Sequence, residues 1–137
     1  MDYSVRSAQY YHGTLADRPE EAYELLAQLA ELGINLLAFT AVPVGPSHMQ
    51  LTLFPEDPAR LETEAKHAGL ALDGPHAAIL VQGDDELGAL ARIHERLARA
   101  SVQIYASSGI ADGQGSFGYL IYLREDQFDG AMDALKS

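Results

Sequence analysis

Two acidic segments, each placed just before a predicted helix, contain residue types that can bind a small charged molecule. The segments are Asp17-Arg18-Pro19-Glu20 and Asp84-Asp85-Glu86-Leu87-Gly88. The free N–H groups at the start of a helix can hold a carboxylate, and acidic side chains can hold an ammonium group. A purely structural role is the alternative, because Asp17 and Asp85 can also cap their helices. The residues alone favour capping, since caps are far more common than anion sites.

Small polar residues in two predicted strands form a second candidate group. They are Ser107, Ser108 and Gly109 in the second half of the chain, opposite Thr40 and Ala41 in the first half. Paired hydroxyls beside a glycine let a polar ligand approach the backbone closely. A strand end that only faces solvent has the same composition, so both interpretations stay open.

Patterns typical of metal binding or catalysis are weak in this sequence. The five histidines, His12, His48, His67, His76 and His94, have neither HxH nor HExxH spacing. Neither a G-x-S-x-G nor a P-loop pattern occurs. Asp84 and Asp85 are adjacent and would point apart on a helix, which disfavours a catalytic dyad. We therefore predict a protein with no catalytic residue, no metal and no cofactor.

Composition limits the classes of partner. The chain has 137 residues, of which 47% are hydrophobic, and no cysteine, so it can bury a core without disulfides. Its formal net charge of −11, from 20 acidic and 9 basic residues, disfavours nucleic acids and anionic membrane surfaces. The N-terminus lacks the apolar core of a signal peptide, and no apolar run approaches a membrane span. We expect a soluble, cytoplasmic protein.

The first acidic segment leads into a helix that the sequence predicts between Asp17 and Gly33. Asp17 is expected to be the N-cap, Glu20 to complete a capping box, and Gly33 to end the helix. The predicted buried face is a stripe of leucines at spacings of three and four: Leu25, Leu26, Leu29 and Leu32. Strands are predicted before this helix, at 5–15, and after it, at 34–44 and 49–54, where the last two form a hairpin.

The remaining elements follow in the same order. A second helix contains Leu61 and ends at Gly69, a short strand covers residues 70–72, and a turn covers residues 73–75. A strand at 76–82 then precedes a third helix. The predicted buried face of that helix is Leu87, Leu90, Ala91, Leu97 and Ala98. Strands at 102–110 and 117–123 and a final helix around residues 128–135 complete the chain.

The two halves of the chain repeat one pattern. Leu29 aligns with Leu97, and Met49 aligns with Phe117, at a common offset of 68 residues. Such a register predicts two βαββαβ units, which we place at residues 1–73 and 74–137. The second unit has no strand after its last helix, so we expect residues 1–8 to complete its sheet.

The repeated order resembles a pair of ACT domains. In that family an Asp-Arg-Pro-Gly turn precedes the first helix, and Gly-Ile/Val-Asn precedes the second strand. Asp17-Arg18-Pro19 and Gly33-Ile34-Asn35 match these motifs, whereas Glu20 replaces the glycine. The second half departs further, with Asp84-Asp85-Glu86-Leu87-Gly88 and Ser101-Val102-Gln103 at the equivalent positions.

The resemblance implies both a fold and a role. The implied fold is α+β, with two ferredoxin-like units whose antiparallel sheets carry helices on one face. The implied role is regulatory binding of a free amino acid or a similar small polar metabolite where the units meet. Homodimer formation and a regulated partner enzyme are implied as well. The residues leave two alternatives open, a small ferredoxin-like enzyme and an adaptor that binds another polypeptide.

Overall fold

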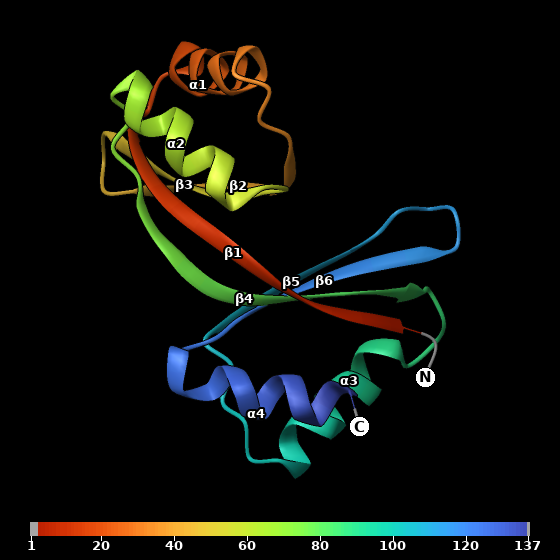
Figure 1. Cartoon of the computed structure of the whole chain (residues 1–137). Helices are drawn as coiled ribbons and strands as arrows, with labels where there is room; N and C mark the ends of the chain where they lie inside the picture. The colour runs from red at the N-terminus through yellow and green to blue at the C-terminus, as the bar shows by residue number, and fades with distance from the viewer. Residues whose placement is uncertain (1–2, 137) are drawn as a thin grey trace. The chain divides into compact units, whose positions relative to one another are not determined.

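The structure of the chain, a computed structural model, describes residues 3–136 (Figure 1). Strands and helices follow one another in the repeating order strand, helix, strand, strand, helix. The elements are β1 (Tyr3–Ala16), α1 (Pro19–Glu31), β2 (Leu36–Val44), β3 (His48–Pro55), α2 (Pro58–Ala68), β4 (Asp73–Asp84), α3 (Ala89–Arg99), β5 (Ala106–Ala111), β6 (Ser116–Tyr122) and α4 (Glu125–Lys136).

The described residues divide into two compact units. Residues 9–76 form what we call the N-terminal unit, and residues 3–8 together with 77–136 form the C-terminal unit. β1 and β4 each contribute to both units, because the divisions fall inside these two strands. The predicted domains, 1–73 and 74–137 with residues 1–8 in the second sheet, include residues 1, 2 and 137, which lie outside the described residues. These domain limits stay a prediction.

The sheet of the N-terminal unit has the strand order β2-β3-β1-β4. Leu53 of β3 lies opposite Phe39 of β2 and opposite Tyr11 of β1, and both pairings are antiparallel. α1 and α2 cover one face of this sheet (Figure 1). The core between them consists of Tyr11, Leu25, Leu29, Ile34, Leu51, Leu53, Leu61 and Ala65. Leu25 and Leu29 are buried, which confirms these two positions of the predicted face of α1, whereas Leu26 and Leu32 are only partly buried.

The sheet of the C-terminal unit has the equivalent order β1-β4-β6-β5. Ser4 of β1 lies beside β4, where its hydroxyl donates to the carbonyl oxygen of Gln82 at 3.3 Å. α3 and α4 cover one face of this sheet (Figure 1) and bury a core of Ile79, Val81, Ile93, Leu97, Phe117, Tyr119, Ile121, Leu123, Ala131 and Leu135. The predicted fold, two ferredoxin-like βαββαβ units with antiparallel sheets, is therefore confirmed.

The buried face of α3 differs from the predicted one. Leu87 is fully exposed and Leu90 is 43% exposed, whereas Ile93 and Leu97 are buried; Ala91 and Ala98 face solvent. The helix begins only at Ala89, because Gly88 before it has a left-handed φ of 83°. Leu87 therefore belongs to the preceding turn, and the buried face recurs every four residues from Ala89.

The predicted short strand at Leu70–Leu72 and the predicted turn at Asp73-Gly74-Pro75 are wrong. β4 begins at Asp73 and continues to Asp84 without a turn. The glycine serves a close approach between strands: a Cβ on Gly74, where φ is 154°, would lie 2.8 Å from the carbonyl oxygen of Tyr10. Glycine inside a strand commonly marks such an approach, which sequence alone does not separate from a turn.

Replacing Gly74 with alanine is expected to lower the free energy of unfolding by about 1–3 kcal/mol, because the added methyl group forces β1 and β4 apart. Chemical denaturation of the two proteins measures this difference. Gly69→Ala is the control for a positive φ alone, since a Cβ at Gly69 meets no atom within 4 Å. A loss no larger at Gly74 than at Gly69 would contradict the close approach.

Tyr11 links β1 to α2 and makes the stability of the fold decrease at high pH. Its hydroxyl donates to Glu62 Oε2 at 2.9 Å. Burial, together with the neighbouring Glu62 carboxylate, raises the pKa of Tyr11 well above its usual value. The neutral phenol is thus favoured in the folded state. The stability that it contributes is complete below pH 10 and is lost as the pH rises toward the folded-state pKa.

The variant Tyr11→Phe is therefore expected to lose stability less steeply above pH 10 than the parent chain. The parent should lose up to about 1.4 kcal/mol more per pH unit, because its unfolded state ionises Tyr11 and its folded state does not. Urea denaturation between pH 8 and pH 11 measures both slopes, and Tyr23→Phe is the control because Tyr23 is 71% exposed. Parallel curves for parent and Tyr11→Phe would contradict the linkage.

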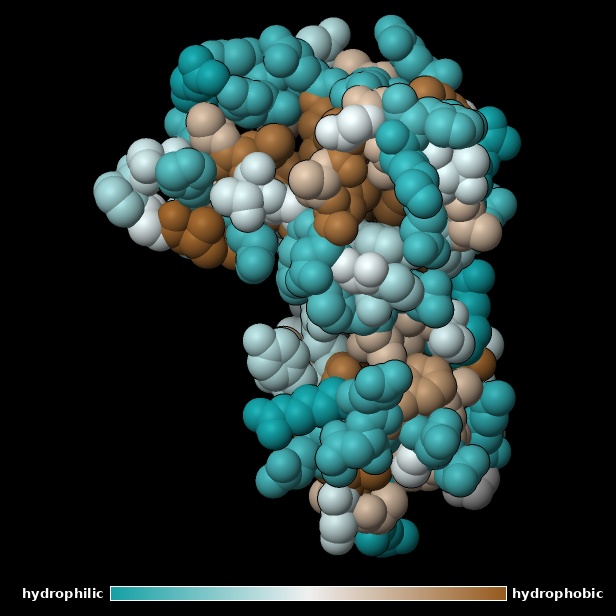
Figure 2. Space-filling model, turned by 60° about the vertical axis from the view of Figure 1, so that its left-hand side comes forward, coloured by the Kyte–Doolittle hydropathy of each residue, from teal (hydrophilic) through white to brown (hydrophobic). Residues whose placement is uncertain are grey.

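Hydrophilic residues cover most of the molecular face shown in Figure 2, as expected for a chain with 20 acidic and 9 basic residues. Among the described residues, no helix combines the length and the apolar composition needed to cross a membrane.

Candidate ligand-binding site

The C-terminal unit contains a hollow of about 590 Å³ beside the start of α3. Four parts of the unit line it. They are the turn after β4 (Asp85–Gly88), the first turn of α3 (Ala89–Ala91), the end of β5 (Gly109–Ala111) and the start of β6 (Phe117 and Gly118). Segments far apart in sequence, the acidic turn and the end of β5, thus meet at one surface.

Three of the predicted site residues line this hollow, namely Asp85, Gly88 and Gly109. Asp84 is the last residue of β4 and pairs with Ser116 of β6, one residue away from the lining. Ser107 and Ser108 lie on the same strand as Gly109 but outside the lining. The structure therefore brings Gly109 of the second predicted group beside the acidic turn and leaves the two serines outside the hollow.

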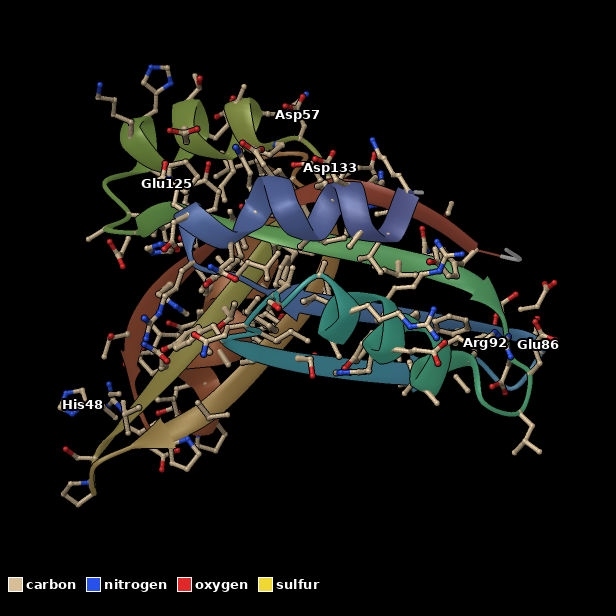
Figure 3. The ribbon with its side chains drawn as sticks, turned by 90° about the horizontal axis from the view of Figure 1, so that it is seen from below. His48, Asp57, Glu86, Arg92, Glu125 and Asp133 are labelled. Atoms are coloured by element: carbon tan, nitrogen blue, oxygen red, sulfur yellow. The ribbon has the colours of Figure 1, made fainter. Side chains whose placement is uncertain are left out.

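Hydrogen bonds hold the turn between β4 and α3. The backbone N–H of Asp85 donates to the carbonyl oxygen of Gly115 at 2.9 Å, which ties the turn to the start of β6. Arg92 of α3 donates to Glu86 Oε1 at 3.0 Å, and the two side chains point toward one another (Figure 3). These bonds give the acidic turn a defined position at the start of the helix.

Neither candidate aspartate caps its helix, so the capping interpretation is wrong. The N-cap residue of α1 is Arg18 and that of α3 is Gly88, and neither makes a side-chain capping bond. Asp17 instead donates its N–H to the carbonyl oxygen of Ser47 at 2.9 Å. The predicted capping box of Glu20 is absent for the same reason, because the helix begins two residues after Asp17.

Gly109 is required where β5 passes Tyr119. A Cβ on Gly109 would lie 2.9 Å from Cδ1 of the Tyr119 ring. The hydroxyl of Tyr119 donates to Ser107 Oγ at 2.8 Å and lies within hydrogen-bonding distance of Nε2 of His94 on α3. The contact between Tyr119 and His94 cannot be predicted from the sequence, because it depends on how α3 crosses the sheet. They fix the position of β5 beside the hollow.

The turn between β5 and β6 is held by the side chain of Asp112. Asp112 Oδ1 accepts the N–H groups of Gln114 at 2.7 Å and Ser116 at 3.1 Å, and these bonds lower the pKa of Asp112. The stretch 113–118, GQGSFG, has the glycine spacing of a dinucleotide-binding loop. It leads into β6 rather than into a helix, so the context that this pattern needs is missing.

The predicted residues of the first half lie in the N-terminal unit. Arg18 forms ion pairs with Glu20, at 3.8 Å, and with Glu21 at the start of α1, next to Pro19. Thr40 and Ala41 lie on β2, opposite Thr52 and Leu51 of β3.

A smaller hollow of about 160 Å³ in this unit lies elsewhere, beside Gly33, Asn35 and Arg60. Among the described residues of the whole chain, no three His, Cys, Asp or Glu side chains gather as a metal site.

Comparison with known proteins identifies the fold. No protein-family model matches the chain, and no curated protein sequence matches it. Among solved structures, protein BT0572 from Bacteroides thetaiotaomicron is similar with a TM-score of 0.81 and 20% identity, over 96% of this chain and 88% of that chain. The regulatory subunit of aspartate kinase from Thermus thermophilus is similar with a TM-score of 0.61 and 18% identity, over 99% and 96% of the two chains.

Aspartate kinase from Clostridium acetobutylicum, described as an allosteric enzyme, is similar with a TM-score of 0.53 and 13% identity. That match covers 97% of this chain and 33% of the kinase. The chain has the fold of a paired ACT-domain protein, which confirms the resemblance seen in its sequence at the level of the fold.

Proposed function

We propose that this protein is a regulatory protein that reversibly binds a free amino acid, or a similarly small polar metabolite, without turning it over. The hollow at the start of α3 carries this proposal, because the acidic turn and the end of β5 both line it. The fold supports it as well, since similar structures include a regulatory subunit of aspartate kinase. We also propose that the protein is cytoplasmic.

The hollow offers a partner for each end of an amino acid. The backbone N–H groups at the start of α3 hold the carboxylate, and Asp85, with Asp84 beside it, holds the ammonium group. Gly88 and Gly109 let the ligand approach the backbone, and Ser107 and Ser108 continue the polar surface along β5. We propose an equivalent site in the N-terminal unit, formed by Asp17, Arg18, Pro19, Glu20, Thr40 and Ala41.

A thermal-shift panel of the twenty amino acids tests the proposed function. An amino acid present at 100 times its dissociation constant should stabilise the protein by about 2.7 kcal/mol, because it binds only the folded state. Betaine and acetate serve as controls for osmolyte and ionic effects. No shift with any amino acid up to millimolar concentration would leave the fold in place and overturn the assignment of an amino-acid ligand.

We further propose that the protein forms a homodimer and acts on a partner enzyme. β5 is an edge strand of its sheet and all six of its residues are exposed, which leaves it open to pairing with a second chain. Light scattering at micromolar concentration should give the mass of a dimer, and a monomer would contradict this assembly.

Exposed apolar side chains favour the adaptor as the second candidate function. Leu87 and Leu90 are exposed beside the hollow, and a polypeptide partner would cover them. Binding of a partner protein that free amino acids do not alter would favour the adaptor.

A further inference from the structure

The hollow exists because one side of β5 carries only small residues. Gly109 lies opposite Tyr119, and Ala111 lies opposite Phe117. Residues directly opposite one another in a sheet share a face, and Tyr119 and Phe117 belong to the core under the helices. Gly109 and Ala111 therefore face the helix side, where a larger residue at either position would occupy the hollow.

Apolar residues also line the hollow. Leu87, which is fully exposed, Ile110, which is 77% exposed, and Leu90, which is 43% exposed, all line it, as does the buried Phe117. Leu87 and Leu90 do not belong to the core of the unit, because Ile93 and Leu97 supply the buried face of α3. Exposed apolar groups that converge on a hollow gain free energy when an apolar ligand covers them.

The charges of the hollow restrict the ligand further. Its lining residues include two carboxylates, Asp85 and Glu86, and no Lys, Arg or His. Glu86 is already paired with Arg92 at 3.0 Å, which leaves Asp85 as the carboxylate available for a positive group. An acidic side chain would therefore meet repulsion, and a second ammonium group would lack a partner.

We propose that this hollow selects amino acids with an apolar side chain of about the size of leucine. The inference rests on the proposed function and specifies its ligand. The ammonium group of the ligand lies at Asp85, and its side chain lies against Leu87, Leu90 and Ala111. Small polar, acidic and basic amino acids are excluded because they leave these leucines uncovered or bring an unpaired charge.

Calorimetric titration of the full chain with six amino acids tests the selection. Leucine, methionine and phenylalanine should bind at least tenfold more tightly than serine, aspartate and lysine, because burial of even one methylene changes affinity about tenfold or more. Ala111→Leu should weaken leucine binding at least tenfold by filling the hollow. Ala106→Leu is the matched control, since Ala106 lies on the same strand opposite Tyr122 and outside the lining.

Each outcome separates the two proposals. If none of the six amino acids binds, the selection fails, whereas the proposed function fails only if the panel of twenty amino acids also gives no shift. If serine, aspartate or lysine binds as tightly as leucine, the function stands and the selection fails. If leucine binds equally well to the parent and to Ala111→Leu, the ligand lies elsewhere and the inference is overturned. Circular dichroism checks that Ala111→Leu and Ala106→Leu are folded.

Discussion

Replacing Leu97 with alanine is expected to lower the free energy of unfolding by about 2–5 kcal/mol. Leu97 is 1% exposed and packs between α3 and the sheet of the C-terminal unit. The substitution removes apolar contacts and leaves a cavity that the surrounding strands fill only in part. Leu29 of α1 occupies the aligned position in the N-terminal unit with the same exposure, so Leu29→Ala should cost a similar amount. Urea denaturation measures both differences.

Leu90→Ala is the matched control for Leu97→Ala. It makes the same chemical change on the same helix, but Leu90 is 43% exposed, so the expected loss is below about 1 kcal/mol. The pair also tests which face of α3 is buried. Equal losses of stability at the two positions would mean that Leu90 is as buried as Leu97. The face of α3 assigned to the hollow would then be incorrect.

The comparison of α1 with α3 shows how far periodicity predicts a buried face. In α1 the leucine stripe, the proline at the start and Gly33 at the end all agree, and the structure buries Leu25 and Leu29. In α3 the leucines mislead, because Gly88 delays the start of the helix and Ile93 occupies the true buried face. Periodicity locates a face only after the first helical residue is known, and here a left-handed glycine fixes it.

Long-range contacts explain what the sequence left open at the candidate site. The acidic turn with Gly88 and the glycine of β5 were recognised from their types. Their meeting was not, because it follows from the pairing of β5 with β6 and from the position of α3 on the sheet. The spacing of Leu87 and Leu90 predicts that both lie in the core, whereas both are exposed. Their exposure beside a hollow is visible only in three dimensions, and it is the feature that makes an apolar ligand side chain the best match.

Replacing Asp85 with asparagine is expected to weaken amino-acid binding by roughly ten- to a hundredfold. Asp85 is the lining carboxylate that no Arg or Lys pairs with among the described contacts, and a hydrogen bond to a charged group contributes about 1.5–3 kcal/mol. Asparagine has the same shape and keeps the backbone bond from residue 85 to Gly115, so the turn should persist. Calorimetric titration of both proteins with the amino acid that the panel identifies measures the loss.

The charge change itself is controlled by Asp133→Asn on α4, where the side chain is exposed and outside the lining of the hollow (Figure 3). This variant carries the same net charge as Asp85→Asn and should bind like the parent chain.

A ligand that lacks the ammonium group tests the proposed ion pair with Asp85 directly. 4-Methylpentanoate, which is leucine without its amino group, should bind weakly to the parent and equally weakly to Asp85→Asn, because neither complex contains the ion pair. If Asp85→Asn instead weakens both ligands to the same extent, Asp85 shapes the turn rather than holding the ammonium group, and the orientation proposed for the ligand is wrong.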